Sequence, residues 1–252
     1  MNFTHRFRKI VPAAIRLQLK IWNRRFTDWR RGIDRKLAKN RILSTSEIPK
    51  FKAQIKLSQP IKNTSHSENK KHNLARAIAC LENRLIYPGE IFSFWHWVGE
   101  PNRKNGYREG RAIVNDKLKT NVGGGLCQLS GIIYFLILKA GILPQERHPH
   151  SQDIYTEETR FTPLGSDATV VYGYKDLRFK NTLAIPICFK FALLDTEITG
   201  ALCSDAEIKE WNVKFKVKEI KKGLKQVETI RYYESIDPPE RIDLTLYPTR
   251  IL

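Results

Sequence analysis

Alternating and helically spaced apolar residues divide the first half of the chain into predicted strands and helices. Residues 51–57 alternate apolar and polar side chains, which predicts a half-buried strand. Residues 65–86 carry apolar side chains at steps of three and four, which predicts a helix. Ser65 and Glu68 form a capping-box pattern at its start, and Pro88 requires it to end before that position.

The segment from Gln128 to Ala140 is apolar around its whole circumference, so it is predicted to be a central, buried helix. Strand patterns dominate around it. The predicted strands cover residues 90–99, 153–156, 168–172, 177–179, 185–194, 211–217 and 226–236. One buried helix among many strands predicts an α+β fold in which the helix begins at Cys127 and packs on a largely antiparallel sheet.

The first 40 residues combine positive charge with a stripe of apolar side chains. They hold twelve basic and two acidic residues, in a chain whose net charge is +18. Their apolar residues recur at helical steps, which predicts one amphipathic helix with Trp and Phe on a single face. The residues of this stripe are Phe3, Phe7, Ile10, Ala14, Leu17, Ile21, Trp22, Phe26, Trp29, Ile33 and Leu37. Such a helix is typical of segments that lie in a membrane interface, and the alternative is a solvated helix packed on its own domain.

The expected partner of residues 1–40 is therefore an anionic membrane surface. The sequence shows no recognition motif or repeated base-stacking pattern, which argues against nucleic acid. The apolar run at 11–15 contains Pro12 and is closed by Arg16, so it is too short for the core of a secretory signal. No apolar run reaches transmembrane length. We expect membrane association without a span, and the sequence alone favours the cytoplasmic side.

Composition shifts predict three parts of the chain. Residues 1–45 form the basic amphipathic segment, and residues 46–205 form an α+β domain. Residues 206–252 form a β-rich extension of the same domain, although no functional inference follows from its last part, 237–252.

Three consecutive glycines precede a cysteine at the predicted start of the buried helix. Gly123, Gly124 and Gly125 permit backbone conformations and close approaches that other residues cannot adopt. Cys127 then falls at a helix N-terminus, where the partial positive charge lowers the pKa of a thiol and favours the thiolate. The glycine N–H groups and the amide of Gln128 could form an oxyanion hole. The alternative is a glycine-rich loop beside a buried, inert cysteine.

A nucleophilic cysteine needs a base, and two histidines that flank a proline follow the predicted helix. His148 and His150 are both candidates. Asp167 is the first candidate for a group that orients the imidazole, and Asp176 is the second. The order of cysteine, histidine and carboxylate is the one used by papain-like peptidases and transglutaminases, which is an analogy at the level of fold.

Several separate motifs, in one order along the chain, resemble the VanW family. They are YPGEIFSF with a following VG, then GY, VGGGLCQLSGIIY, AG, ERHPHS, and GSDATVVYG with KDLRFKN, between about residues 73 and 189. That family is associated with B-type vancomycin resistance clusters and with the bacterial cell envelope. Members that carry this domain are implicated in peptidoglycan cross-linking as cysteine-dependent L,D-transpeptidases.

The resemblance implies that Cys127 is the nucleophile and that the base is His148 or His150. His150 is favoured because the His-Ser pair matches the family pattern best. It also implies peptidoglycan or a cell-wall precursor as the partner, and Asp167 and Asp176 as polar partners. Secreted members carry an export signal or anchor that this sequence does not show, so the resemblance implies the cell envelope where the sequence alone favours the cytoplasm.

Two functions of different classes stay open. One is a cysteine acyltransferase of the cell envelope, and the other is a non-catalytic membrane-surface accessory or ligand-binding protein. A zinc site of Cys127, His148 and His150 is a weaker third, because His-Pro-His is an awkward ligand pair and no fourth ligand is evident. No metal or cofactor is therefore expected.

Overall fold

The computed structural model describes residues 11–114, 117–153, 160–233 and 238–249. Within them, helices and strands surround one central helix, so the predicted α+β class is confirmed. The helices are α2 (Ala13–Arg30), the 3-10 turn η1 (Asp34–Lys36), α3 (Ser67–Leu81), α4 (Phe94–Val98) and α5 (Leu126–Lys139). The strands are β1 (Lys52–Pro60), β2 (Ile91–Ser93), β3 (Glu109–Val114), β4 (Lys117–Val122), β5 (Pro144–Glu146), β6 (Arg178–Lys180), β7 (Cys188–Leu193), β8 (Glu197–Ser204), β9 (Asn212–Lys221), β10 (Leu224–Tyr232) and β11 (Glu240–Pro248).

The strands pair in an antiparallel manner, as expected, but they divide among four small sheets. Three sheets have three strands, in the orders β1-β8-β7, β11-β10-β9 and β2-β6-β5, and the fourth is the hairpin β3-β4. Short loops join β7 to β8 and β9 to β10, which is the usual connection between antiparallel neighbours.

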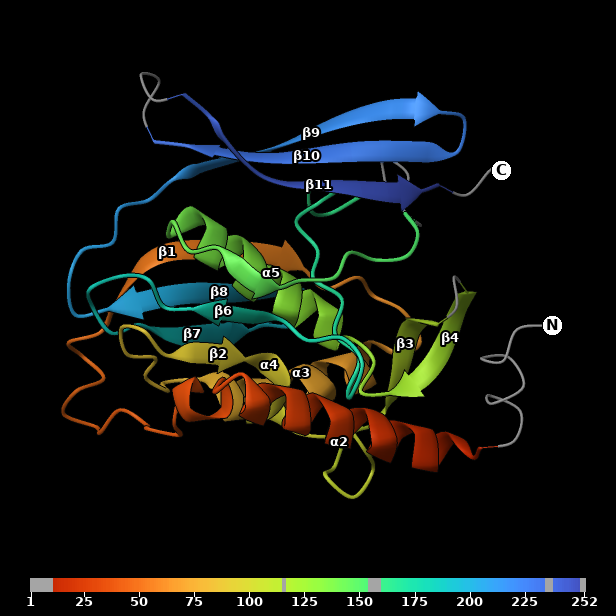
Figure 1. The fold of residues 1–252 in the computed structure, drawn as a ribbon, viewed down its shortest axis with the longest axis horizontal. Helices are drawn as coiled ribbons and strands as arrows, with labels where there is room; N and C mark the ends of the chain where they lie inside the picture. The colour runs from red at the N-terminus through yellow and green to blue at the C-terminus, as the bar shows by residue number, and fades with distance from the viewer. Residues whose placement is uncertain (1–10, 115–116, 154–159, 234–237, 250–252) are drawn as a thin grey trace.

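Helix α5 is the centre of the molecule. It lies between the β1-β8-β7 sheet and the β11-β10-β9 sheet (Figure 1), and it contacts β1, β8 and β9. Leu129, Ile132, Ile133 and Leu136 are fully buried, as expected for a helix that is apolar on all sides. The helix begins at Leu126, one residue before Cys127, so the predicted position of the cysteine in the first turn is confirmed.

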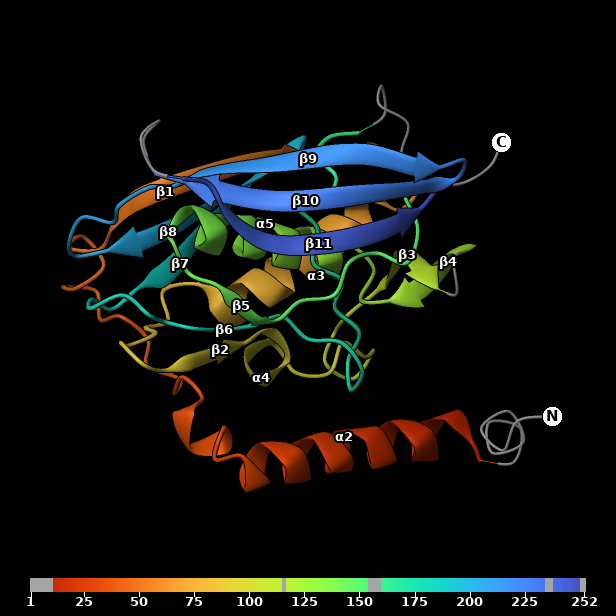
Figure 2. The same ribbon diagram turned by 45° about the horizontal axis from the view of Figure 1, so that its top comes forward.

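The three C-terminal strands, β9 to β11, form a sheet that covers one side of α5 (Figure 2). Phe215 of β9 packs edge-on against Phe135 of α5, with ring centroids 5.3 Å apart. Val227 and Tyr247 are buried with Leu164 in a small apolar cluster beneath this sheet. We call the β11-β10-β9 sheet the C-terminal sheet below.

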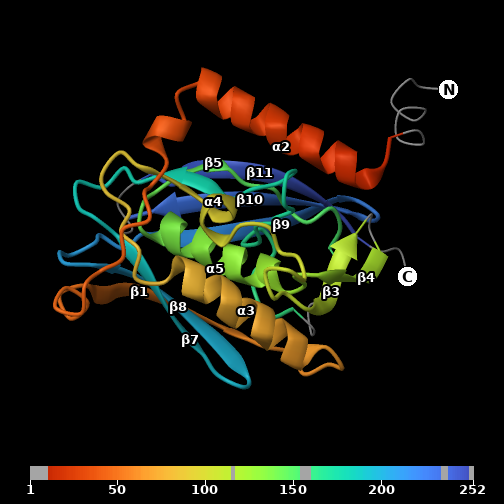
Figure 3. The same ribbon diagram turned by 90° about the horizontal axis from the view of Figure 1, so that it is seen from below.

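Helix α2 lies along the side of the molecule opposite the C-terminal sheet (Figures 1 and 2), and in the view from below it runs along one margin of the molecule (Figure 3). It is shorter than the stripe of apolar residues predicts, because the helix ends at Arg30 and Leu37 instead forms a β-bridge with Ile91. The stripe is also divided between two faces. Leu17 and Ile21 are half-buried, whereas Trp22, Phe26 and Trp29 are exposed. Residues 1–10 of the predicted helix lie outside the described residues.

Several local predictions differ from the structure. The aromatic stretch 90–99 is only partly a strand, since Ser93 caps the short helix α4 by accepting a hydrogen bond from the backbone of His96 at 3.2 Å. The predicted capping box is wrong: α3 begins at Ser67, whose hydroxyl accepts a hydrogen bond from the backbone of Thr64 at 2.6 Å. Residues 168–172 form no strand, and most of 153–156 lies outside the described residues. The remaining predicted strands overlap β1, β6, β7, β9 and β10.

Candidate active site

The three glycines before Cys127 allow two backbone segments to meet. Gly124 lies against Gly110 of β3, where a Cβ on Gly124 would come within 2.3 Å of the Gly110 backbone. Gly125 ends the loop with a left-handed φ of 103°, a conformation that L side chains rarely adopt. The glycines therefore have a structural role: they let the loop turn into α5 while it touches the β3-β4 hairpin.

Asn73 of α3 fixes this loop. Its side-chain amide donates hydrogen bonds to the carbonyl oxygens of Arg108 and Gly124, at 2.9 and 3.0 Å, and its oxygen accepts one from the backbone of Arg108 at 2.8 Å. Asn73 is fully buried, so these bonds satisfy a polar group that would otherwise be costly in the core. The start of α5 is thus held from outside the helix.

Small residues in α5 hold the segment that carries Asp167. The hydroxyl of Ser130 donates to the carbonyl oxygen of Ala168 at 2.6 Å. The next residue is Gly131, where a Cβ would stand only 3.6 Å from the carbonyl oxygen of Ser166. The Ser130 hydrogen bond therefore holds the 166–168 segment along the first turns of the helix, and the distance at Gly131 is an ordinary van der Waals contact that would also admit a methyl group.

Cys127 is half-buried, and its thiol donates a hydrogen bond to the carbonyl oxygen of Val170 at 3.7 Å. Burial opposes ionisation of this thiol, but the hydrogen bond and positive charge of His150 outweigh burial, so the pKa of Cys127 is lowered. A carbonyl oxygen can only accept a hydrogen bond, so the contact with Val170 belongs to the neutral thiol and is lost when the sulfur ionises.

His150 is held by Asp167 through two contacts with the same carboxylate oxygen. The Oδ2 atom of Asp167 lies 2.7 Å from Nδ1 of His150 and accepts a hydrogen bond of 2.6 Å from the His150 backbone. Burial disfavours the imidazolium, but Asp167 and the Cys127 sulfur favour it more strongly and raise the pKa of His150 to about 10. Because Nδ1 is engaged by Asp167, Nε2 is the ring nitrogen left to serve the thiol.

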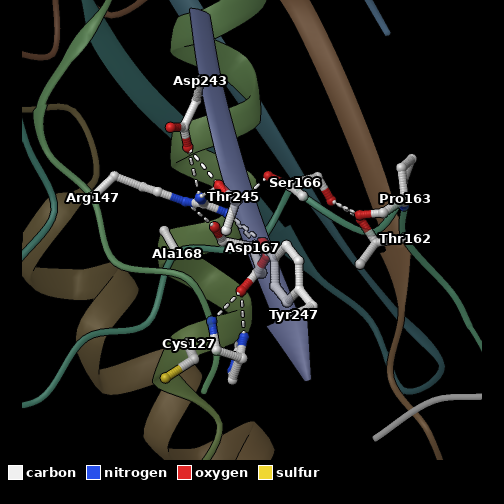
Figure 4. Close-up of polar contacts among 12 residues, drawn as sticks. Cys127, Arg147, Thr162, Pro163, Ser166, Asp167, Ala168, Asp243, Thr245 and Tyr247 are labelled. Atoms are coloured by element: carbon white, nitrogen blue, oxygen red, sulfur yellow. Dashed lines mark hydrogen bonds and ion pairs between the residues drawn. The ribbon is translucent and has the colours of Figure 1, made fainter. Parts of the chain in front are cut away.

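The other oxygen of Asp167 is held by Arg147 and Tyr247 (Figure 4). Oδ1 accepts a hydrogen bond of 3.0 Å from Nη2 of Arg147 and one of 2.5 Å from the hydroxyl of Tyr247. Burial disfavours ionisation of this carboxyl, yet His150 first, and then Arg147 and Tyr247, hold the pKa of Asp167 well below its usual range. In Figure 4, Asp167 lies between Arg147 on one side and Cys127 on the other.

Arg147 connects this carboxylate to the surrounding backbone and to the C-terminal sheet. Its side chain is almost fully buried and donates to the carbonyl oxygens of Asp167 and Gly165, at 2.8 and 2.9 Å. Nη1 donates to Asp243 at 3.0 Å and to Thr245 at 2.9 Å, both on β11. Asp243, Thr245 and Tyr247 are thus functional candidates that sequence reasoning missed. The signal was the alternation of polar and apolar residues along 242–247.

His148 and Asp176 lie apart from this cluster. Nε2 of His148 contacts Glu146 at 3.0 Å. Asp176 is buried and accepts hydrogen bonds from the hydroxyl of Ser93 at 2.6 Å and from Arg178 at 2.9 Å. The structure therefore brings together Cys127, His150 and Asp167, and it directs the other two candidates into a structural ion-pair network.

Some of the expected donors of an oxyanion hole are already hydrogen-bonded within the protein, and others are not. The side-chain amide of Gln128 donates to the carbonyl oxygen of Pro60 at 3.0 Å, and its backbone N–H donates to Gly125. The N–H groups of Gly123 and Gly124 are also bound, to Arg108 and Asn121. In the described part of the chain, the N–H groups of Gly125, Leu126 and Cys127 make no hydrogen bond.

The described residues contain no group of three or more His, Cys, Asp and Glu side chains arranged to hold a metal ion. Cys127 lines neither of two surface hollows. One is lined by residues of the 103–109 segment and by Asn69, and the other lies between α2 and the body of the protein. Within the described residues, no helix is both long and apolar enough to cross a membrane.

This geometry defines the class of the protein: an α+β protein in which a cysteine at a helix N-terminus lies beside a histidine paired with a buried aspartate. The sequence profile of the family described as "VanW like protein" matches residues 69–203, more than half of the chain. The chain belongs to this family, which is associated with vancomycin resistance.

Two curated proteins are similar to part of the chain. Vancomycin B-type resistance protein VanW of Enterococcus faecalis is 32% identical over 142 residues, which are 56% of this chain and 52% of that protein. Uncharacterized protein YoaR of Bacillus subtilis is 32% identical over 126 residues, which are 50% of this chain and 40% of that protein. The chain thus spans about half or less of these curated relatives. No solved structure matches it.

Proposed function

We propose that the protein is a cysteine-dependent acyltransferase of the cell envelope that acts on the stem peptides of peptidoglycan. The observation that carries the proposal is the lowered pKa of Cys127 beside His150, whose Nδ1 is held by Asp167 at 2.7 Å. A thiolate and imidazolium in contact are the reactive form of a nucleophilic cysteine and its acid–base partner. The similarity to a vancomycin B-type resistance protein supports a wall peptide as the substrate.

In the first half-reaction, the Cys127 thiolate attacks the carbonyl carbon of an amide bond between L- and D-centres. The tetrahedral intermediate collapses when the carbon–nitrogen bond breaks, and the imidazolium of His150 gives its proton to the departing amine. The products are a thioester on Cys127, a neutral His150 and a free amine. Asp167 stays ionised throughout, because it stabilises the imidazolium and fixes the ring without taking a proton itself.

In the second half-reaction, the amine of a neighbouring stem peptide attacks the thioester carbonyl. Neutral His150 accepts the proton of that amine, the carbon–sulfur bond breaks, and the thiolate and imidazolium are restored. The result is a new amide cross-link; water in place of the amine would give hydrolysis. One residue thus serves as acid in the first step and as base in the second.

The negative oxygen of both intermediates needs hydrogen-bond donors. The backbone N–H groups of Gly125, Leu126 and Cys127 suit this role, because within the described residues they have no other partner and they stand at the positive end of α5. We assign the oxyanion to these groups in place of Gln128, whose side-chain amide is bound to Pro60 at 3.0 Å.

The second candidate is a non-catalytic accessory or ligand-binding protein of cell-wall metabolism. One observation favours it: the half-buried thiol donates to the carbonyl oxygen of Val170 at 3.7 Å, an arrangement that also suits an inert cysteine. The two candidates differ in the reactivity of Cys127, and the alkylation experiment described in the Discussion separates them.

The test of acyl transfer uses purified Cys127→Ala and Cys127→Ser variants on muropeptides, with cross-linked and cleaved products separated by chromatography. Cys80→Ala is the matched control, because Cys80 is also half-buried but lies in α3. We expect both Cys127 variants to lose all measurable turnover and the control to keep it. If both Cys127 variants retain full cross-linking or cleavage, the assignment is wrong.

The compartment is a separate part of the proposal. The same peptide occurs in the cytoplasmic wall precursor and in the finished wall, so the chemistry of the site is compatible with either location. We place the protein at the membrane surface, and fractionation with protease accessibility on intact cells distinguishes the two sides.

A further inference from the structure

Helix α2 presents a continuous apolar stripe to the outside of the molecule. The stripe consists of Ile15, Leu19, Trp22, Phe26 and Trp29, whose exposed fractions lie between 46% and 66%. These positions follow steps of four and three, so they share one face of the helix. Trp22 and Phe26 stack with ring centroids 5.8 Å apart, and Phe26 contacts Trp29 at 5.9 Å. A contiguous aromatic face of this kind marks an interaction surface.

Ion pairs on the opposite face fix this orientation. Arg24 pairs with Glu146, and Arg178 donates to both carboxylate oxygens of Asp28 at 2.8 Å. Arg178 also donates to buried Asp176 at 2.9 Å, which ties α2 to the interior. The polar face of α2 therefore lies on the protein.

Gly173 completes this inner contact. A Cβ at Gly173 would stand 2.6 Å from a methyl group of Leu17 and 3.2 Å from Ile21, so the helix rests directly on that turn. The apolar stripe cannot also reach the core, because the opposite face of the helix already packs on the protein through its ion pairs and the Gly173 contact.

Positive charges flank the stripe on both sides. Arg25 and Arg30 are exposed, and neither forms an ion pair within the described residues. Helix α2 itself carries five basic residues against one acidic residue, so the surroundings of the stripe favour an anionic partner. Trp and Phe next to Arg is the composition that enters the headgroup region of a bilayer.

We propose that α2 is a membrane-surface helix: its Ile15, Leu19, Trp22, Phe26 and Trp29 stripe enters the interface of an anionic phospholipid membrane while its polar face stays on the protein. Arg25 and Arg30 contact the phosphate groups on either side. The C-terminal sheet lies on the opposite side of the molecule and faces away from the bilayer (Figures 1 and 2). This inference stands independently of acyl transfer at Cys127.

The test measures binding of the full chain to vesicles of phosphatidylcholine alone and of phosphatidylcholine with phosphatidylglycerol, by flotation and by the blue shift of Trp fluorescence. We expect binding only to the anionic vesicles, weakened at least tenfold in a Trp22→Gln/Phe26→Gln variant. Leu194→Gln/Leu246→Gln is the matched control, because both leucines are similarly exposed but lie far from α2 in the chain. Its binding should equal that of the wild type.

A second variant separates charge from apolar contact. Arg25→Gln/Arg30→Gln should keep the apolar stripe but lower both the affinity for anionic vesicles and its dependence on salt. The proposal is overturned if the wild type does not bind anionic vesicles, or if the Trp22→Gln/Phe26→Gln variant binds as well as the control. It is also overturned if the stripe is covered by a second copy, which sedimentation would reveal as a dimer that this variant converts to monomer.

Discussion

The hydroxyl of Tyr247 donates a 2.5 Å hydrogen bond to the carboxylate of Asp167, although the two residues are separated by 80 positions in the chain. Burial and the negative charge of Asp167 raise the pKa of Tyr247, so the phenol stays protonated and remains a donor. Tyr247 lies on β11, beyond residues 69–203 that match the family profile. The carboxylate that orients His150 is therefore supported by strands outside the family region.

Removal of the Tyr247 hydroxyl should weaken the site without destroying the fold. In Tyr247→Phe the ring still fills the cluster with Val227 and Leu164, but Oδ1 of Asp167 loses one of its two donors. A hydrogen bond to a charged group contributes about 1.5–3 kcal/mol, so urea unfolding should report a loss of that order. Alkylation of Cys127 should also slow, because His150 is less firmly held.

The matched control is Tyr174→Phe, since Tyr174 is exposed and its hydroxyl makes no hydrogen bond among the described residues. It should leave both stability and alkylation unchanged. A Tyr247→Phe protein that equals this control in both measurements would contradict the support of Asp167 by the C-terminal sheet.

Cys127 should react with iodoacetamide at mildly acidic pH faster than a free cysteine does, because its lowered pKa preserves the thiolate there. Cys188 and Cys203 are fully buried in β7 and β8 and serve as internal controls that should hardly react. Mass spectrometry of tryptic peptides after timed exposure gives the rate at each cysteine. A rate at Cys127 no higher than at Cys188 would favour the accessory protein over the acyltransferase.

The two histidines should differ in their effect on that thiol. His150→Gln removes the group that lowers the pKa of Cys127, so alkylation at mildly acidic pH should fall by at least tenfold. His148→Gln is the natural control, because His148 contacts Glu146 and not the thiol. Equal losses in the two variants would mean that the choice of His150 is wrong.

The pH dependence of the free energy of unfolding should show whether Asp167 is ionised in the folded protein. The pKa of Asp167 is lowered in the folded protein, so its contribution to stability is present above the unfolded value of about 3.9. That contribution is lost as the pH falls through the folded pKa. We expect Asp167→Asn to be destabilised at neutral pH by about 1.5–3 kcal/mol, because buried Arg147 keeps Asp243 but loses one of its two carboxylate partners.

The difference between the wild type and Asp167→Asn in urea unfolding should then narrow as the pH falls below about 4. The difference is the useful quantity, because other carboxylates such as Glu146 also titrate in acid and cancel in the comparison. A difference that stays constant between about pH 5 and pH 3 would mean that folding does not lower the pKa of Asp167, and a difference that widens as the pH falls would mean that Asp167 is protonated in the folded protein.

Gly124 should tolerate no side chain. In Gly124→Ala the new methyl would meet the Gly110 backbone at 2.3 Å, a contact that only movement of β3 or of the loop can relieve. We expect a loss of about 1–3 kcal/mol, typical of overpacking, with slower alkylation of Cys127. Gly131→Ala, within α5, is the control: its Cβ would meet atoms no closer than 3.6 Å, and alanine favours the helix by about 1 kcal/mol. A Gly124→Ala variant with unchanged stability and unchanged alkylation of Cys127 would contradict the close contact between the loop and β3.

The sequence predicts elements in this protein better than it predicts which of their faces is buried. The period of apolar residues correctly places α5 and several strands, because burial on all sides or on one face leaves a clear pattern. In α2 the period is also helical, but it does not show that the stripe divides into an inner part with Leu17 and Ile21 and an outer part with Trp22. The ion pairs of Arg24 and Asp28 with the body of the protein decide that division.

In strand β11 the buried face is the more polar one. Burial along 242–247 runs opposite to hydrophobicity, because the structure buries Thr245 and Tyr247 and exposes Leu244 and Leu246. The reason is Arg147: a buried guanidinium requires polar partners, and β11 supplies them. That requirement depends on residues about a hundred positions away, which no local pattern contains.

The candidate site divides in the same way. Local motifs were enough to predict Cys127, His150 and Asp167 as candidate site residues. The structure was needed to separate His150, which contacts Asp167, from His148, which contacts Glu146. The backbone donors could not be assigned from the sequence either, since Gln128 is drawn to Pro60 across the fold.

The contact between the C-terminal sheet and Asp167 also limits how far the protein can be shortened for expression. A recombinant fragment trimmed to residues 69–203 would contain Cys127, His150, Asp167 and Arg147. It would lack strand β11, whose side chains form hydrogen bonds with Arg147 and Asp167. Such a fragment would carry every reactive group and still expose a guanidinium and a carboxylate to water. The full chain is therefore the protein to express in any search for activity.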